Sequence, residues 1–258
     1  MEPVYQERMS RYFIELSFKG THYHGWQLQP NAITVQALIE AALKTLTRES
    51  IKTTGAGRTD AGVHAQFYVA HFDSECQIFD NKPDFIFKIN ALLQKDIAIQ
   101  DIYRVLPNAH ARYSALSRTY KYTISLIKDP FDVECSWYYS ASVDLAAMNQ
   151  SAGRLKDYID FTSFSKLHSN AKTNICHIQE AVWTIHEHKL TFTIRADRFL
   201  RNMVRALVGT MIDVGRGKLS QTDFIRILAG KNRSTAGFSA PAEGLSLICV
   251  EYPKDIKI

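Results

Sequence analysis

Between residues 190 and 196 every second position is apolar, and the positions between them are polar. Because successive side chains of an extended chain point to opposite faces, this alternation predicts a half-buried β-strand. Runs rich in β-branched and aromatic residues predict the other strands. We expect these at residues 12–18, 52–54, 65–72, 97–105, 118–125, 175–186 and 245–250. The segments 175–186 and 190–196 are expected to form a hairpin.

Apolar residues recur at helical spacing after Thr34, which is a suitable N-cap residue. The apolar side of this predicted helix carries Val35, Leu38, Ala41, Ala42 and Leu46. The same spacing predicts helices at residues 85–93, 144–155, 199–214 and 222–228. The elements form two halves of similar size, which we divide into residues 1–130 and 131–258. Their order favours an α+β fold with a largely antiparallel sheet.

The composition is that of an ordinary globular protein, with 46% hydrophobic and 22% charged residues among 258. No apolar stretch approaches the roughly 20 residues that span a bilayer. The first residues lack the apolar region of a signal peptide. We therefore expect a cytoplasmic protein that does not enter a membrane.

The motifs of several cofactor-dependent classes are missing from the sequence. No two of the four cysteines have CxxC spacing, which argues against a zinc site or a disulfide framework. Neither a Walker A motif nor a GxGxxG motif is present. His22 and His24 have no third metal ligand nearby in the sequence. The sequence thus predicts neither a metal nor an organic cofactor.

Positive charge is concentrated in the second half of a chain whose formal net charge is +5. Between residues 195 and 233 the only acidic residues are Asp197, Asp213 and Asp223. The basic residues there are Arg195, Arg198, Arg201, Arg205, Arg216, Lys218, Arg226, Lys231 and Arg233. A concentrated basic region suits a polyanion such as RNA. A solvated basic helix face explains the same charges equally well.

The segment from Gly55 to Ala65 (GAGRTDAGVHA) combines three glycines with Arg58 and Asp60. Glycine permits backbone conformations and close approaches that other residues disfavour. Asp60 is its only carboxylate, so paired-carboxylate chemistry has no local support. A lone aspartate beside arginine fits covalent catalysis, in which the carboxylate adds to an electrophilic carbon.

Two further segments could supply a site around Asp60. On the predicted helix 199–214, Arg201, Asn202 and Arg205 lie opposite a broad apolar stripe, and Arg198 extends the same side. This face is either solvated or lines a site in which a guanidinium pairs with a carboxylate.

Aromatic and basic residues alternate between residues 118 and 122, where Tyr120 and Tyr122 share a strand face with Arg118. His22, Tyr23, His24 and Trp26 form another aromatic cluster. Such residues either pack in a core or stack on bases and neutralise phosphates.

The sequence GRTDAGVHA at residues 57–65 resembles the signature of the TruA family, the tRNA pseudouridine synthases A. Other blocks of this sequence resemble the same family, and they occur in the family's order between residues 11 and 253. They are residues 18–27, 114–115, 118–122, 160–164, 202–205, 208–209, 214–215 and 242–245. The stretch 165–171 departs from the pattern of many relatives, so no role is carried over to it.

This resemblance implies an isomerase that converts uridine to pseudouridine at positions 38, 39 and 40 of the tRNA anticodon stem-loop, without a cofactor or metal. It implies a homodimer whose protomers each contain two related RRM/ferredoxin-like halves around a central catalytic cleft. By the same resemblance, Asp60 is the nucleophile, Arg58 holds the flipped nucleotide and Tyr120 stacks on the target base. Arg205 pairs with Asp60, and Leu245 lines the uracil pocket. Arg198, Arg201, His22 and Trp26 are expected to contact RNA.

Two other functions are compatible with parts of the sequence. One is a non-catalytic RNA-binding protein on the same scaffold, and the other is an unrelated enzyme that uses Asp60 on a small substrate. The presence of Arg58, Asp60, Tyr120 and Arg205 together argues against the first. The clustered basic residues argue against the second.

Overall fold

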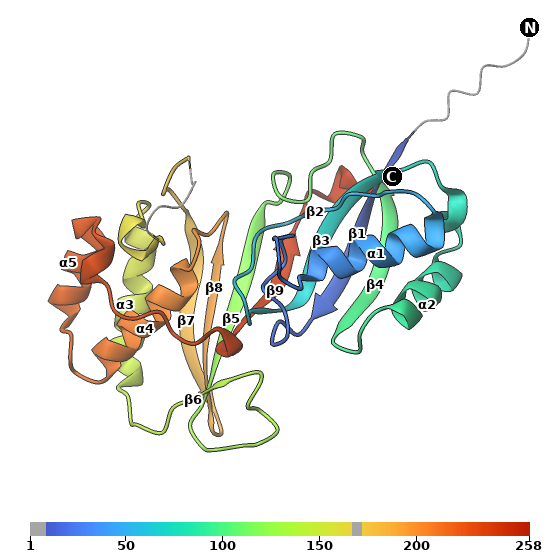
Figure 1. The fold of residues 1–258 in the computed structure, drawn as a ribbon. Coiled ribbons are helices and arrows are strands. Elements are labelled where there is room, and N and C mark those ends of the chain that lie inside the picture. The colour runs from blue at the N-terminus through green and yellow to red at the C-terminus, as the bar shows by residue number, and fades with distance from the viewer. Residues whose placement is uncertain (1–8, 167–171) are drawn as a thin grey trace, which may run out of the picture.

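The computed structural model describes residues 9–166 and 172–258, which form an α+β structure with one continuous sheet (Figure 1). Its nine strands are β1 (Ser10–Phe18), β2 (Thr54–Gly55), β3 (His64–Ser74), β4 (Ile97–Val105), β5 (Ser117–Ser125), β6 (Trp137–Tyr138), β7 (Ile178–His186), β8 (Lys189–Ala196) and β9 (Leu245–Glu251). Its helices are α1 (Val35–Thr47), α2 (Lys82–Leu92), α3 (Leu145–Arg154), α4 (Met203–Gly215) and α5 (Gln221–Gly230). The predicted α+β class is confirmed, and part of the stretch 165–171 lies outside the described residues.

The two halves of the sheet share one topology. The strand order is β4-β1-β3-β9-β5-β8-β7, and β2 pairs with β3 outside this path. The first half is thus β4-β1-β3-β2 and the second is β9-β5-β8-β7, with every pair inside each half antiparallel. In each half the fourth strand of a β-α-β-β-α-β unit lies beside the first, β4 beside β1 and β9 beside β5, as in ferredoxin-like folds. No repeat of short period is visible in the sequence, and two related halves were expected only from the family resemblance.

Strand β9 joins the halves, because it lies between β3 and β5. It pairs in parallel with β3 at His64–Ser246 and Ala65–Leu247, and antiparallel with β5. Leu245 belongs to the core of the second half, whereas Leu247 and Val250 belong to the core of the first. The chain therefore passes from the first core to the second and back again.

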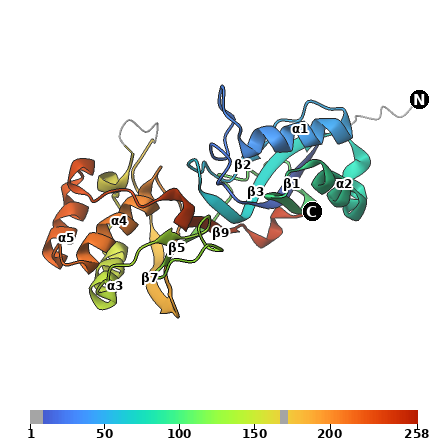
Figure 2. The same cartoon turned by 60° about the horizontal axis from the view of Figure 1, so that its bottom comes forward.

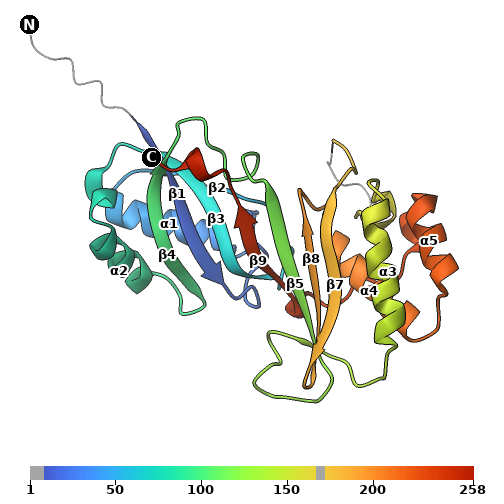
Figure 3. The ribbon, with the colours of Figure 1, turned by 180° about the vertical axis from the view of Figure 1, so that it is seen from behind.

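The two groups of helices lie on either side of β5 and β9 (Figure 2). Helices α1 and α2 cover the core of the first half, which includes Ile39, Leu43 and Phe85. Helices α3, α4 and α5 pack over the core of the second half. Figure 3 shows the sheet from behind, with β1, β3 and β4 nearer the viewer than α1. The segments around β5 and β9 thus occupy the middle of the molecule.

Most predicted elements are present with bounds shifted by a few residues. Thr34 caps α1 as predicted, because its hydroxyl accepts a hydrogen bond of 3.4 Å from the backbone N–H of Ala37. The predicted helix 199–214 is wrong at its start, since α4 begins only at Met203. Asn202 has a φ of 66°, which is incompatible with a right-handed helix. Arg198 and Arg201 therefore lie on the segment that leads into α4.

Candidate active site

Asp60 lies on the connection between β2 and β3, which is held closely against the segment around Gly25. Gly25 has a φ of +81°, and a Cβ there would lie 2.1 Å from the carbonyl oxygen of Thr59. The next backbone N–H, that of Trp26, donates 2.9 Å to the Thr59 hydroxyl. Only glycine allows this approach. The residue directly before Asp60 is therefore fixed by a segment more than thirty positions earlier.

Two arginines reach the Asp60 carboxylate, one at each oxygen. Arg205 Nη1 lies 3.4 Å from Oδ2, and Arg201 Nε lies 3.5 Å from Oδ1. The side chain of Asp60 is 23% exposed. The expected Asp60–Arg205 pair is thus joined by Arg201, which the sequence had assigned only to RNA contact. On the predicted helix 199–214 the spacing of four residues had placed both arginines on one side, which was the available signal.

The two arginines differ in how firmly they are held. Arg205 is on the first turn of α4, its side chain is 20% exposed, and its Nε donates 2.6 Å to the carbonyl oxygen of Ala240. The side chain of Arg201 is 52% exposed and lies before the helix. An exposed ion pair contributes little because water and salt screen it. Arg205 is therefore the better-fixed partner of Asp60.

Tyr120 lies between the two cores and packs against both. Its ring meets that of Phe199 edge-to-face, with 5.1 Å between the ring centroids. Burial raises the pKa of Tyr120 to about 12, with a smaller contribution from the nearby Asp60 charge. The hydroxyl therefore stays protonated at neutral pH and can act as a hydrogen-bond donor close to the carboxylate.

Arg118 is buried two residues before Tyr120 on the same strand, which decides for this arginine between the two possibilities that the sequence left open, packing in a core or contact with RNA. It is 9% exposed. Its guanidinium donates to the carbonyl oxygens of Ala56, Arg112 and Asp197. Burial lowers the pKa of this group. Its hydrogen bonds thus go to backbone groups, a role that the alternating pattern of β5 did not reveal.

His64 connects the other end of the Asp60 segment to β9. The backbone N–H of Gly20 donates 2.9 Å to Nδ1, so Nε2 carries the hydrogen of the neutral ring and faces the carbonyl oxygen of Glu243 at 3.0 Å. Burial lowers the pKa of His64, which favours this neutral form. The imidazole therefore holds together the Gly20 segment, the Asp60 segment and the approach to Leu245.

The other predicted site residues are distributed more widely. Arg58 is exposed, and its Nε donates to Oε1 of Gln27. Leu245 is buried opposite Tyr122 in the register of β9 and β5. His22 is exposed, with Nδ1 3.2 Å from Asp96 Oδ2. Arg198 is half-buried in the segment before α4.

Trp26 was expected to contact RNA, but its side chain is buried and only 3% exposed. Its ring lies against that of Tyr68, with 4.4 Å between the ring centroids. The Tyr68 hydroxyl in turn donates to the carbonyl oxygen of Gly57. Trp26 therefore packs beneath the Asp60 segment and has almost no surface left to contact RNA.

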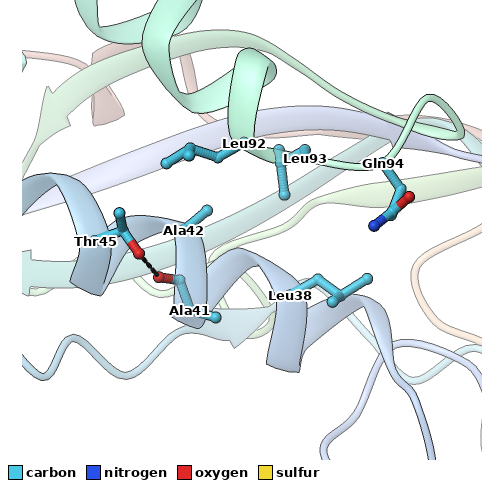
Figure 4. Close-up of a pocket in the computed structure, with 7 residues that line it drawn as sticks. All are labelled: Leu38, Ala41, Ala42, Thr45, Leu92, Leu93 and Gln94. Carbon is cyan, nitrogen blue, oxygen red and sulfur yellow. Dashed lines mark hydrogen bonds between the residues drawn. The ribbon is translucent and has the colours of Figure 1, made fainter.

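A groove between α1 and the end of α2 contains none of these residues. It has a volume of about 170 Å³ and is lined mainly by apolar side chains (Figure 4). The Thr45 hydroxyl at its edge already donates 3.0 Å to the carbonyl oxygen of Ala41.

Among the described residues, no group of three or more His, Cys, Asp or Glu side chains could hold a metal ion. No helix in the same ranges is long and apolar enough to cross a membrane.

The fold and the site define an α+β protein in which one carboxylate, paired with two arginines, lies beside a partly buried tyrosine. A family model described as tRNA pseudouridine synthase matches residues 16–114 and 159–253. The chain belongs to this family of isomerases, which convert uridine to pseudouridine in tRNA.

Individual relatives match over nearly their whole length. The tRNA pseudouridine synthase A of Bacteroides fragilis is 52% identical, with 96% of this chain and 98% of the relative covered. That of Parabacteroides distasonis is also 52% identical, with the same coverage. The synthase of an Exiguobacterium species is 37% identical, with 95% and 99% covered. The similarity thus extends through both halves of the sheet.

Proposed function

We propose that this protein isomerises uridine to pseudouridine at positions 38, 39 and 40 of the tRNA anticodon stem-loop, with Asp60 as the nucleophile. The observation that carries this proposal is the placement of Asp60 between Arg201 and Arg205. Family membership supplies the reaction. A tRNA substrate is also our reason to propose a cytoplasmic location.

The reaction conserves all atoms of the uridine. The bond from N1 to C1′ breaks, the uracil turns, and a bond from C5 to C1′ forms; C5 loses a proton and N1 gains one. Asp60 can add to the sugar, add to the base, or assist formation of a glycal. In each route the carboxylate must face a nucleotide that has left the helix stack. Arg205 orients it through a charge-assisted contact.

The remaining site residues suit a flipped nucleotide. Tyr120 offers an aromatic face next to Asp60 on which the detached uracil is retained. Leu245 lines the pocket from β9, one strand away. Arg58 is exposed and able to hold a backbone phosphate, and Arg198, Arg201 and His22 extend the contact to the stem. Binding through phosphates should weaken as the salt concentration rises.

The proposal is tested by mapping pseudouridine in tRNA from cells with and without this gene. We expect pseudouridine at positions 38–40 to be lost in the deletion and restored by the plasmid-borne gene. The same deletion complemented with Asp60→Ala should stay unmodified. An anticodon stem-loop that is fully modified without the gene would contradict the substrate assignment.

Replacing Tyr120 with Phe should leave tRNA binding within about threefold, because the aromatic face remains. We expect kcat to fall by less than about tenfold, since only the hydroxyl is removed. Single-turnover rates on an unmodified transcript measure this. Tyr120→Ala is the matched variant and should lose much more, because it removes the stacking surface. A loss in Tyr120→Phe as large as that in Tyr120→Ala would assign chemistry to the hydroxyl.

We also propose that two copies of the chain associate. The segment between β5 and β6 exposes Phe131, which is 96% exposed, together with Val133 and Ile127. A groove of about 580 Å³ lies beside it and is lined mainly by polar and charged residues, among them Lys121, Asp132 and Lys189. Exposed apolar side chains next to a groove on the same surface suit a self-complementary contact, in which each copy serves both roles.

The association predicts that Phe131→Asp shifts the protein from dimer to monomer in analytical ultracentrifugation. Phe87→Asp, which replaces an exposed phenylalanine on α2 away from this surface, is the control and should sediment like the parent protein. A Phe131→Asp variant with unchanged sedimentation would exclude this surface.

A further inference from the structure

Arg118 occupies the point where three backbone segments of the site converge. Nε and Nη2 lie 3.3 and 3.0 Å from the carbonyl oxygen of Ala56, and Nη1 lies 2.8 Å from that of Asp197. Nη2 also lies 2.5 Å from the carbonyl oxygen of Arg112. The planar guanidinium presents its donors in fixed directions, so it fixes the relative positions of the groups that accept them.

Two of these segments carry the two sides of the candidate ion pair. Ala56 precedes Asp60 by four residues, and Asp197 precedes Arg201 by four residues. Tyr120 lies two residues along β5 from Arg118, on the same face of the strand. A shift of the guanidinium would therefore move the carboxylate, its arginines and the tyrosine relative to one another.

The hydrogen bonds of the Arg118 side chain in the described ranges all go to carbonyl oxygens, and it forms no ion pair there. A buried charge lowers stability unless its surroundings compensate for it. An apolar side chain would fill the same space without that cost, but it could not hold three carbonyl groups in register. The arrangement is thus better suited to fixing geometry than to adding stability.

We propose that Arg118 is a positioning residue, which sets the Asp60 segment in register with the segment that bears Arg201 and Arg205. It contacts neither partner of the ion pair and acts through their backbones. This inference rests on the proposed role of Asp60. It adds to that role a single buried side chain on which the alignment of the site depends.

The test compares Arg118→Ala with Arg118→Lys in the full chain on an unmodified tRNA transcript. We expect Arg118→Ala to lower kcat by about 100-fold, since a misplacement of 1 Å is enough for such a loss. KM for tRNA should change by less than about threefold. Arg118→Lys should be intermediate, because an ammonium group cannot span three carbonyls. Guanidinium ion, added well below denaturing concentrations, should restore at least about a tenth of the parent kcat to Arg118→Ala.

Arg11→Ala is the matched control. Arg11 is a partly buried arginine of β1 that bonds to Asp73 and to the carbonyl oxygen of Ala109, away from Asp60. Its loss should lower the midpoint of thermal unfolding without changing kcat, and guanidinium should not increase its activity. Activities are compared per folded molecule, measured by circular dichroism.

The outcomes separate this inference from the proposed function. An active Asp60→Ala variant would overturn the role of Asp60. If Asp60→Ala is inactive while folded Arg118→Ala and Arg118→Lys keep the parent kcat, only the positioning role is overturned. If Arg118→Ala does not fold, Arg118→Lys decides: a parent kcat per folded molecule refutes the inference, and a reduced kcat at unchanged KM supports it.

Discussion

Replacing Asp60 with Ala should lower pseudouridine formation by about 10⁴-fold or more, because the proposed nucleophile is removed. Binding of the transcript should stay within about tenfold of the parent value, since the phosphate contacts remain. Asp60→Asn, which keeps the shape and loses the charge, should be equally inactive. Quantifying pseudouridine in single-turnover reactions gives the rate, and filter binding gives the affinity.

Asp101→Ala is the control for the loss of a surface carboxylate. Asp101 pairs with Lys82 in the first half of the sheet and does not contact the candidate site. Its removal should leave the rate unchanged. Pseudouridine formation by Asp60→Asn at the parent rate would show that the negative charge is not required and would refute the nucleophile assignment.

Replacing Arg205 with Met should lower kcat by about 10²–10³-fold, the range found when one well-placed donor is removed from a site. The reason is the fixed geometry of its guanidinium, which bonds to the Ala240 carbonyl and reaches Asp60 at 3.4 Å. The same change at Arg201 should lower kcat by about tenfold or less, because its side chain is half exposed and screened. Its larger effect should be on KM for tRNA, and this effect should shrink at high salt.

Measuring both variants at low and high salt separates the two roles. Arg201→Met is the internal control for Arg205→Met, since each variant removes one guanidinium from the same carboxylate. Equal losses of kcat in the two variants would contradict the distinction between a fixed partner and an exposed one.

Local patterns predicted the elements well but could not predict which strands become neighbours. The Thr34 cap and the strand at 190–196 follow from short-range rules, and both are present. The position of β9 between β3 and β5 depends on pairing between segments far apart in the sequence. Apolar alternation marks a strand as buried on one face, but it does not identify its partners.

The candidate site was predicted in part, and the misses have physical causes. The Asp60–Arg205 pair came from the resemblance, which assigned Arg201 only to RNA contact. The predicted helix also began too early, before Asn202. The positive φ of that residue is a tertiary feature that spacing does not encode. Trp26 was placed on the surface, although an indole is large enough to support a loop from below. Arg118 was missed because sequence rules assign arginine to surfaces.

The position of β9 has a consequence for how the enzyme acquires its activity. Strand β9 supplies Leu245 to one core, Leu247 to the other, and pairs with strands that are synthesised much earlier. Contacts of such high sequence separation form slowly and late in folding. Each half can gain its helices and local hairpins during synthesis, but the two cannot be aligned before residue 251 has emerged. A chain truncated before β9 would therefore retain Asp60 and Tyr120 but lack the strand that joins the two cores, and we expect it to be inactive.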